Sequence, residues 1–318
     1  MEEFEEKVQK DEEEFEVAEV KINLQTGGFI AGRFWGDKSV QPFVCIHGWQ
    51  DNAGTFDRLI PLLPKQYSYL AIDLPGHGKS SWLPNGVAYH NFDFISVLIL
   101  LMKEYKWDKI SIIGHSLGGY IAFFFAAIFP NKVDKIISID ALKPSVYTSN
   151  RLVYALQQTI ENFPIADQRN VDGDVIEYTY DEMIEKIYNA FLNSVSKEAA
   201  PYVLRRGALP SKKQPGKYYF SRDGRLRYNF GFYLGHSMYI ELATQIKLPY
   251  LILKAAKFPI TEDHEYFNET LSAMKTNPNF EYHEIDTFSH HLHLTEPEKI
   301  VGIIEDFMEK YKKVESHL

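Results

Sequence analysis

The sequence is poor in cysteine and in long apolar runs. Its 318 residues include one cysteine, Cys45, so no internal disulfide can form and the fold must be held together by apolar burial. Cys45 lies in the apolar run 43–46, which favours a buried thiol without a chemical role. The longest apolar stretches, 94–102 and 120–129, are well short of the roughly 20 residues that cross a bilayer, so we expect no membrane span.

Positive charge is also scarce. The chain has 34 Lys and Arg against 43 Asp and Glu, for a net charge of -9. Most of this excess lies in residues 1–16, an acidic tail with nine acidic and two basic side chains. Nucleic-acid binding needs a basic surface, and a secretory signal needs a positive start followed by an apolar run. We therefore expect no nucleic-acid partner and a protein that stays inside the cell.

Short apolar runs rich in β-branched residues alternate with helical patterns up to residue 140 and again after about residue 247. This alternation predicts an α/β fold with a mostly parallel sheet and helices on both faces. The core would then comprise residues 17–140 and 247–318. The expected strands are 17–24, 28–35, 42–47, 68–73, 109–114, 135–140, 249–254 and 280–285, and the clearest helices are 92–105, 117–129 and 297–312.

The stretch 141–246 breaks this alternation. It contains helical patterns at 153–160 and 181–191 and a stretch, 218–226, that is typical of a hairpin. A block of about 100 residues between two strands of one sheet indicates an inserted cap over the strand ends, where ligands bind in open α/β sheets.

The strongest chemical signal is the segment Gly-His-Ser-Leu-Gly-Gly at 114–119. It follows a predicted strand and precedes a predicted helix, as a nucleophile elbow does, and it would expose the hydroxyl of Ser116 at the helix N-terminus. A second motif, His-Gly-Trp at 47–49, ends another strand. In such an arrangement the backbone N–H groups of Trp49 and Leu117 would converge as an oxyanion hole.

A nucleophilic serine needs a general base and an acid that orients it, in the chain order Ser, acid, His. For the base, His290 is our choice and His291 the alternative, with His293 packing nearby. Asp140 is our choice for the acid because it ends a strand at the edge of the sheet that carries Ser116. Glu262 and Asp263, after the next core strand, are the alternatives.

The sequence offers little for a metal or a cofactor. The histidines at 290, 291 and 293 lack the i, i+4 spacing of a helical zinc pair, and no further carboxylate cluster is apparent. The stretch 73–80 ends in Gly-Lys-Ser like a phosphate loop, but Asp73 replaces the first glycine and Pro75 removes a backbone donor. We expect a structural loop at 73–80, and neither a metal nor a cofactor.

These motifs together resemble the α/β-hydrolase superfamily, and more closely the animal serine hydrolase-like proteins of the Kraken type. The resemblance covers most of the chain and rests on the stretches 47–52, 56–64, 73–78, 114–119, 220–226 and 290–297. It implies an α/β-hydrolase fold with eight core strands and a helical cap, Ser116 as nucleophile and His290 as base.

The resemblance also bears on the choices left open above. Pro297, seven positions after His290, has the spacing associated with the family's catalytic histidine. The family's common acid position falls on Phe258, which moves the acid to Asp140, as in members that carry it one strand earlier. Phe288 stands where a glycine often precedes the histidine. A serine at the elbow, in place of the aspartate of epoxide hydrolases and haloalkane dehalogenases, implies acyl transfer.

The expected activity is hydrolysis of an ester, thioester or related acyl bond in a small, partly apolar substrate. The main alternative is a hydrolase-fold sensor or inactive scaffold that binds a small apolar ligand, and cofactor-free oxygenase or peroxidase chemistry is a third. The final tripeptide, Ser316-His317-Leu318, is similar to the Ser-Lys-Leu address read by the peroxisomal import receptor. The expected location is therefore peroxisomal or cytoplasmic.

Overall fold

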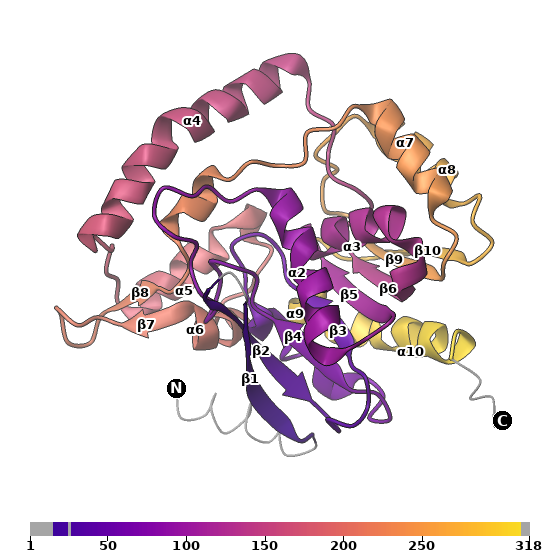
Figure 1. The fold of residues 1–318 in the computed structure, drawn as a ribbon, viewed down its shortest axis with the longest axis horizontal. Helices are drawn as coiled ribbons and strands as arrows, with labels where there is room; N and C mark the ends of the chain where they lie inside the picture. Colours follow the sequence, from indigo (N-terminus) through magenta and orange to yellow (C-terminus); the bar gives the residue numbers. More distant parts are fainter. Residues whose placement is uncertain (1–14, 25–26, 313–318) are drawn as a thin grey trace.

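The protein is built on one eight-stranded sheet (Figure 1). The computed structural model describes residues 15–24 and 27–312. The strands lie in the order β1-β2-β4-β3-β5-β6-β9-β10. Their bounds are β1 (Val17–Asn23), β2 (Phe29–Trp35), β3 (Phe43–Ile46), β4 (Tyr69–Ile72), β5 (Ile110–His115), β6 (Val133–Ile139), β9 (Tyr250–Ala255) and β10 (Phe280–Ile285).

The sheet confirms the predicted α/β-hydrolase architecture. The pairs β1–β2 and β2–β4 are antiparallel, and all other neighbours in the sheet are parallel. All eight predicted strands are present, with bounds within two residues of the prediction. Four of them, β3, β4, β5 and β9, are apolar over nearly their whole length because they are buried on both faces.

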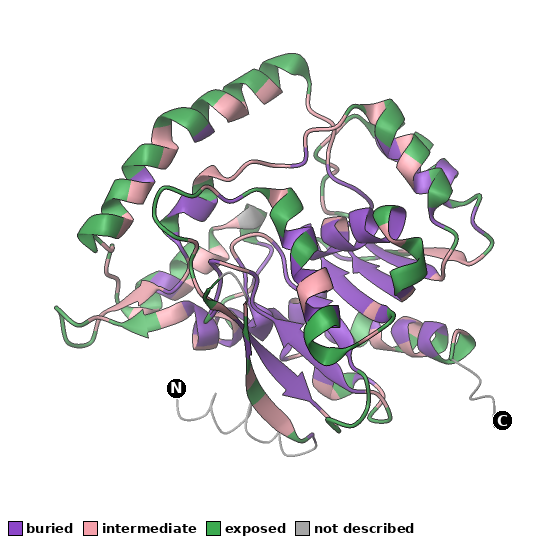
Figure 2. Cartoon of the chain, viewed as in Figure 1, coloured by how far each residue is buried: buried purple, intermediate pink, exposed green. Residues whose placement is uncertain are grey.

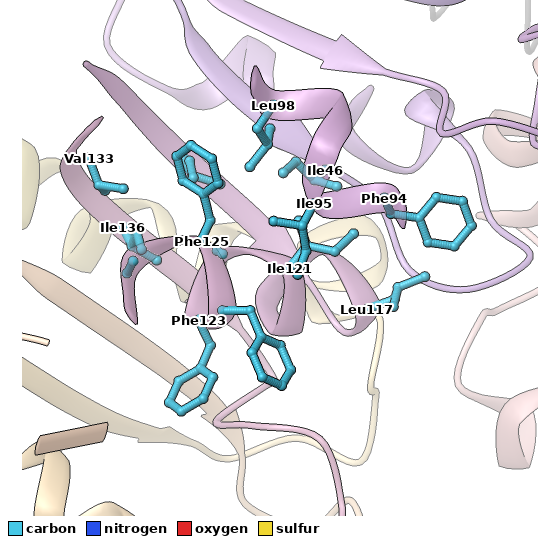
Figure 3. Packing of buried hydrophobic residues seen from close by; sticks show 14 of the residues in the cluster. Ile46, Phe94, Ile95, Leu98, Leu117, Ile121, Phe123, Phe125, Val133 and Ile136 are labelled. Atoms are coloured by element: carbon cyan, nitrogen blue, oxygen red, sulfur yellow. The ribbon is translucent and has the colours of Figure 1, made fainter. Parts of the chain in front are cut away.

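Successive side chains of the strands point to opposite faces of the sheet and pack in two hydrophobic cores, one on each face. On one face Val44, Ile46 and Ile112 pack against helices α2 (Asn91–Tyr105) and α3 (Leu117–Ile128), as Figure 3 shows for part of this cluster. On the other face Cys45 and Ile113 pack against helix α10 (Val301–Lys310) and the turns after β3. The predicted burial of Cys45 is confirmed.

The chain between β6 and β9, residues 140–249 and here called the β6–β9 segment, carries most of the remaining helices. These are α4 (Ser149–Asp172), α5 (Tyr180–Tyr188), α6 (Ala200–Gly207) and α7 (His236–Gln245), with a two-stranded sheet of β7 (Ala208–Pro210) and β8 (Tyr218–Phe220). Helix α4 forms the outer edge of the molecule and is largely exposed (Figures 1 and 2). Helix α7 instead contributes Tyr239 and Ala243 to the core beside α3 and α8 (His264–Met274).

Two buried arginines attach the β6–β9 segment to the rest of the fold. The guanidinium of Arg206 in α6 donates to the carboxylate of Asp73 after β4, with an Nη2–Oδ2 distance of 2.7 Å. The guanidinium of Arg225 donates to Asp223 and to the carbonyl oxygens of Leu83 and Pro84. Both arginine side chains are almost fully buried.

Several sequence-based expectations have different outcomes here. The hairpin at 218–226 is wrong: β8 pairs with β7, and the Asp223 side chain caps a 3₁₀ turn at Gly224–Tyr228, which ends the extended backbone. No helix within the described ranges is long and apolar enough to span a bilayer. The acidic tail, apart from residues 15 and 16, and the C-terminal tripeptide lie outside the described residues. The division of the chain into core and cap stays a prediction.

Candidate active site

Ser116 occupies a strained turn between β5 and α3. Its backbone torsion angles are φ 51° and ψ -113°, a region that side-chain-bearing residues seldom adopt and that is held only by a well-packed surrounding. The Ser116 N–H donates to the carbonyl of Ile139, and the Ser116 carbonyl accepts from the N–H of Tyr120. The predicted strand–turn–helix setting of the serine is therefore present.

The neighbouring glycines let the turn pack tightly. A Cβ on Gly114 would come 2.5 Å from the carbonyl oxygen of Gly118. A Cβ on Gly118 would overlap the carbonyl oxygen of Ile46 in β3. Side chains at these positions would therefore separate α3 from the sheet, and the position of Ser116 depends on their absence.

Asp140 and His290 form a buried hydrogen-bonded pair. Asp140 directly follows β6, and its Oδ2 lies 2.5 Å from Nδ1 of His290, which follows β10. Asp140 has a positive φ of 48°, and its N–H donates to the carbonyl of Leu253. The ring of His290 stacks on Phe258 with 4.9 Å between centroids. Since an ionised carboxylate only accepts, the short contact places a proton on Nδ1 of His290 and leaves Nε2 as the basic nitrogen.

Lys254 completes the surroundings of the Asp140 carboxylate, and sequence reasoning missed it. The second carboxylate oxygen, Oδ1, accepts from Nζ of Lys254 at 2.8 Å and from the N–H of Ala255 at 2.9 Å. The carboxylate thus has donors on both oxygens. The sequence did contain a signal for this role: Lys254 is a charged residue inside the otherwise apolar strand β9, and β9 is the neighbour of β6, the strand that ends before Asp140.

Ser116, Asp140 and His290 line one cavity of about 220 Å³. Most of its surface is apolar and comes from residues after β6 and β9. One wall carries a buried ion pair between Lys143 and Glu262, with an Nζ–Oε1 distance of 2.6 Å. Burial lowers the pKa of Lys143, and Glu262 partly offsets this effect. The apolar lining comes from Tyr120, Ala141, Leu142, Phe258, Pro259, Ile260 and Phe267.

The expected oxyanion-hole amides lie on the two segments that the sequence suggested. Leu117 is the first residue of α3, and Trp49 follows β3. Among the hydrogen bonds between described residues, neither backbone N–H has a partner. The two segments are close together, since a Cβ on Gly48 would lie 3.2 Å from Cβ of Ser116. Both amides are thus available to a ligand oxygen.

The alternative residues have other partners. Glu262 pairs with Lys143, and Asp263 caps helix α8 by accepting from the N–H of Glu265. His291 Nδ1 lies 2.8 Å from Oγ of Ser194, and His293 Nε2 lies 2.9 Å from Oγ1 of Thr55. Among the predicted acids and bases, the structure therefore joins Asp140 to His290.

The stretch 73–80 forms a structural loop, as expected. The carboxylate of Asp73 accepts from the backbone N–H groups of Ala53 and Lys79 and from Arg206. A buried carboxylate at this point would repel a phosphate.

A second cavity of about 270 Å³ is lined by Asp51, His291 and Arg222, among others. Burial lowers the pKa of His291 and of His115 well below the usual value, so both rings stay neutral at pH 7. Burial also raises the pKa of Asp51 to about 7, with Arg222 acting in the opposite direction.

Comparison with known proteins agrees with this architecture. Residues 41–181 match the family described as alpha/beta hydrolase fold. A probable serine hydrolase of Drosophila melanogaster is 34% identical over 285 residues, which cover 89% of this chain and 85% of the relative. Serine hydrolase-like protein 2 of Homo sapiens is 30% identical over 305 residues, or 92% and 94% of the two chains.

A solved structure has the same fold. A hypothetical protein of Pseudomonas aeruginosa superposes with a TM-score of 0.78 at 23% sequence identity, covering 92% of this chain and 99% of its own. The fold, the elbow and these relatives define the class: this chain belongs to the α/β-hydrolase family. Within that family it is similar to the serine hydrolase-like proteins.

Proposed function

We propose that the protein is a serine hydrolase that cleaves an ester, thioester or related acyl bond through Ser116, His290 and Asp140. The observation that carries the proposal is that Ser116 at its strained elbow shares one cavity with a histidine hydrogen-bonded to a buried carboxylate. The serine hydrolase-like relatives support the same class of chemistry.

In the proposed reaction Ser116 Oγ attacks the acyl carbon while its proton passes to Nε2 of His290. The tetrahedral oxyanion accepts from the N–H groups of Trp49 and Leu117. The bond from the acyl carbon to the leaving oxygen or sulfur then breaks, and His290 returns the proton to the leaving group. A water molecule repeats the sequence on the acyl-enzyme, with His290 taking the water's proton and finally giving it to Oγ of Ser116.

The Asp140 carboxylate would hold His290 in the tautomer with the proton on Nδ1 and stabilise the imidazolium ion that forms. Donation from Lys254 and Ala255 to the other oxygen of Asp140 fixes the carboxylate for this role. The apolar wall of the cavity favours a substrate with an apolar acyl part, because such a group gains about 25 cal/mol per Å² of apolar surface removed from water.

Labelling with a fluorophosphonate probe tests the proposal. The folded wild-type chain should label at Ser116, and Ser116→Ala should not label. A series of esters and thioesters of increasing acyl length, with Ser116→Ala as the blank, then reports substrate preference. A folded wild-type protein that never labels and turns over none of the series would favour the ligand-sensor alternative.

A further inference from the structure

A cluster of nitrogen and oxygen ligand atoms lies behind the elbow, and the proposed reaction does not use it. Asp51, His115 and His291 each offer one such atom, and the three atoms lie within 4.8 Å of one another. All three residues are buried. We propose that Asp51, His115 and His291 form a binding site for a divalent transition-metal ion of the zinc type.

Two side-chain atoms of these residues have no hydrogen-bond partner within the described part of the chain. Nδ1 of His115 and Oδ2 of Asp51 are buried without a hydrogen bond. Leaving such groups unsatisfied lowers stability, and more so when a group is charged, so a buried group without a partner calls for an explanation. A metal ion would satisfy both atoms at once. It would also offset the negative charge of Asp51, on which the charge of Arg222 already acts in the same direction.

The surrounding hydrogen bonds orient the ligands as metal sites require. Nε2 of His115 lies 3.0 Å from the carbonyl oxygen of His290. A carbonyl only accepts, so Nε2 carries the proton and the lone pair of His115 is on Nδ1. Oγ of Ser194 holds Nδ1 of His291 at 2.8 Å, and the N–H of Asn52 holds Oδ1 of Asp51 at 2.8 Å. Supporting contacts of this kind fix the rings and carboxylates of metal sites.

The donor set and its geometry suit zinc. Two imidazole nitrogens and one carboxylate oxygen are a set that Zn²⁺ accepts, with a fourth position left for water. Bonds of about 2.0–2.1 Å require ligand atoms about 3.3 Å apart. The Nε2 of His291 and Oδ2 of Asp51 are 3.8 Å apart, so a small rotation of each side chain would close the site.

An entry path is also present. Asp51 and His291 both line the second cavity of about 270 Å³, so the site can be reached from that side. The sequence-based expectation of no metal considered the histidines 290, 291 and 293 as a group. In the structure the three rings all pack around His115 but have different partners. His290 joins Asp140 and His293 joins Thr55, while His291 meets Asp51 and His115 from distant parts of the chain.

Occupancy of the site would link three segments that the proposed reaction needs. Asp51 follows Trp49 by two residues, His115 precedes Ser116, and His291 follows His290. An ion bound to all three would fix the oxyanion loop, the elbow and the histidine loop relative to one another.

Metal binding to the full-length chain, freed of metal by chelation, tests the proposal without any activity measurement. Co²⁺ serves as a visible probe and Zn²⁺ as its competitor. We expect one Co²⁺ per chain with the intense visible absorption of four- or five-coordinate cobalt, its displacement by Zn²⁺, and a rise in Tm with Zn²⁺.

The variant Asp51→Asn removes the charge but keeps an oxygen for the N–H of Asn52. Loss of a supporting contact already costs 10- to 100-fold in metal affinity, so loss of this ligand should weaken Co²⁺ binding at least about 100-fold. The control His236→Gln removes a histidine that pairs with Glu269 outside the cluster, and it should leave binding unchanged. Equal binding by wild type and Asp51→Asn, or loss of binding in His236→Gln alone, would overturn the site.

If Asp51→Asn does not fold, X-ray absorption of the zinc-loaded wild type still tests the site, because it identifies the ligands of the bound zinc. Two imidazole ligands and no sulfur are expected. Fewer than two imidazoles, or no stoichiometric zinc, would refute the proposal and leave water as the occupant. Because these measurements do not involve catalysis, a negative result for metal binding can be told apart from a lack of the proposed hydrolase activity.

Discussion

The substitution Asp140→Asn gives the sharpest test of the proposed triad, because the surroundings of the carboxylate dictate how the new amide must lie. Oδ1 of Asp140 faces two donors, Nζ of Lys254 and the N–H of Ala255. The amide oxygen of the substituted side chain must take this place, since its NH₂ group would meet donors there. The NH₂ group then faces Nδ1 of His290. It can only donate, so His290 must carry its proton on Nε2 and can no longer accept the proton of Ser116.

A histidine held in the wrong tautomer lowers kcat by roughly 10⁴ in serine hydrolases with this arrangement, equivalent to about 5.5 kcal/mol of barrier. We expect a loss of this order in the rate of fluorophosphonate labelling at Ser116 and in the turnover of any active ester. The matched control is Asp263→Asn: this residue caps α8, and Asn caps a helix as well as Asp does. The control should therefore keep its fold and its labelling rate.

Stability has to be separated from catalysis in this experiment. Removing one partner of a buried ion pair typically costs about 3–5 kcal/mol, so Asp140→Asn alone would leave the buried charge of Lys254 without a counter-charge and lower Tm. The double variant Asp140→Asn, Lys254→Met should regain part of that stability but none of the activity. The reasoning is refuted if a folded Asp140→Asn protein labels at a tenth or more of the wild-type rate, or if Asp263→Asn loses the activity instead.

Three further outcomes can be measured. Lys254→Met should lower the unfolding free energy in urea by about 3 kcal/mol and slow labelling less than Asp140→Asn does; an unchanged urea midpoint would contradict the pairing. Gly118→Ala should lower Tm because its Cβ overlaps the carbonyl of Ile46, whereas Gly302→Ala in the open part of α10 should not; equal Tm values would argue against the close packing. Burial lowers the pKa of His47 to about 4 from 6.5, so the unfolded chain binds a proton between these values that the folded chain does not, and stability falls as pH drops from 6.5 to 4. This group alone accounts for on the order of 3 kcal/mol, and His47→Gln should flatten the Tm–pH curve in that window; an equally steep curve would show that His47 is not the cause.

The sheet could be predicted from the sequence because its strands are buried on both faces and therefore appear as continuous apolar runs. Asp140 could be chosen because the ends of parallel strands meet at one edge, and the contact with His290 agrees with that choice. The role of each residue in catalysis stays a proposal.

Other features were not visible in the sequence. The stretch 153–160 marks only part of α4, which runs from Ser149 to Asp172 and continues through Pro164, although a proline usually ends a helix. The hairpin prediction failed because the partner of β8 precedes it in the chain, where a short β7 gives no periodic signal. The contact of His291 with His115 and Asp51 joins three distant segments, which local spacing rules cannot detect.

The buried arginines of the β6–β9 segment determine how its attachment responds to ionic strength. Salt at physiological concentration screens exposed charges over about 8 Å but has much less effect on buried pairs. Arg206 with Asp73 is a buried pair that joins the segment to the loop after β4, and Arg225 with Asp223 is a buried pair within the segment. We therefore expect the attachment of α6 to the loop after β4 to persist in concentrated salt. Helix α4 is bonded to the same segment through Asp167, which accepts from Arg225.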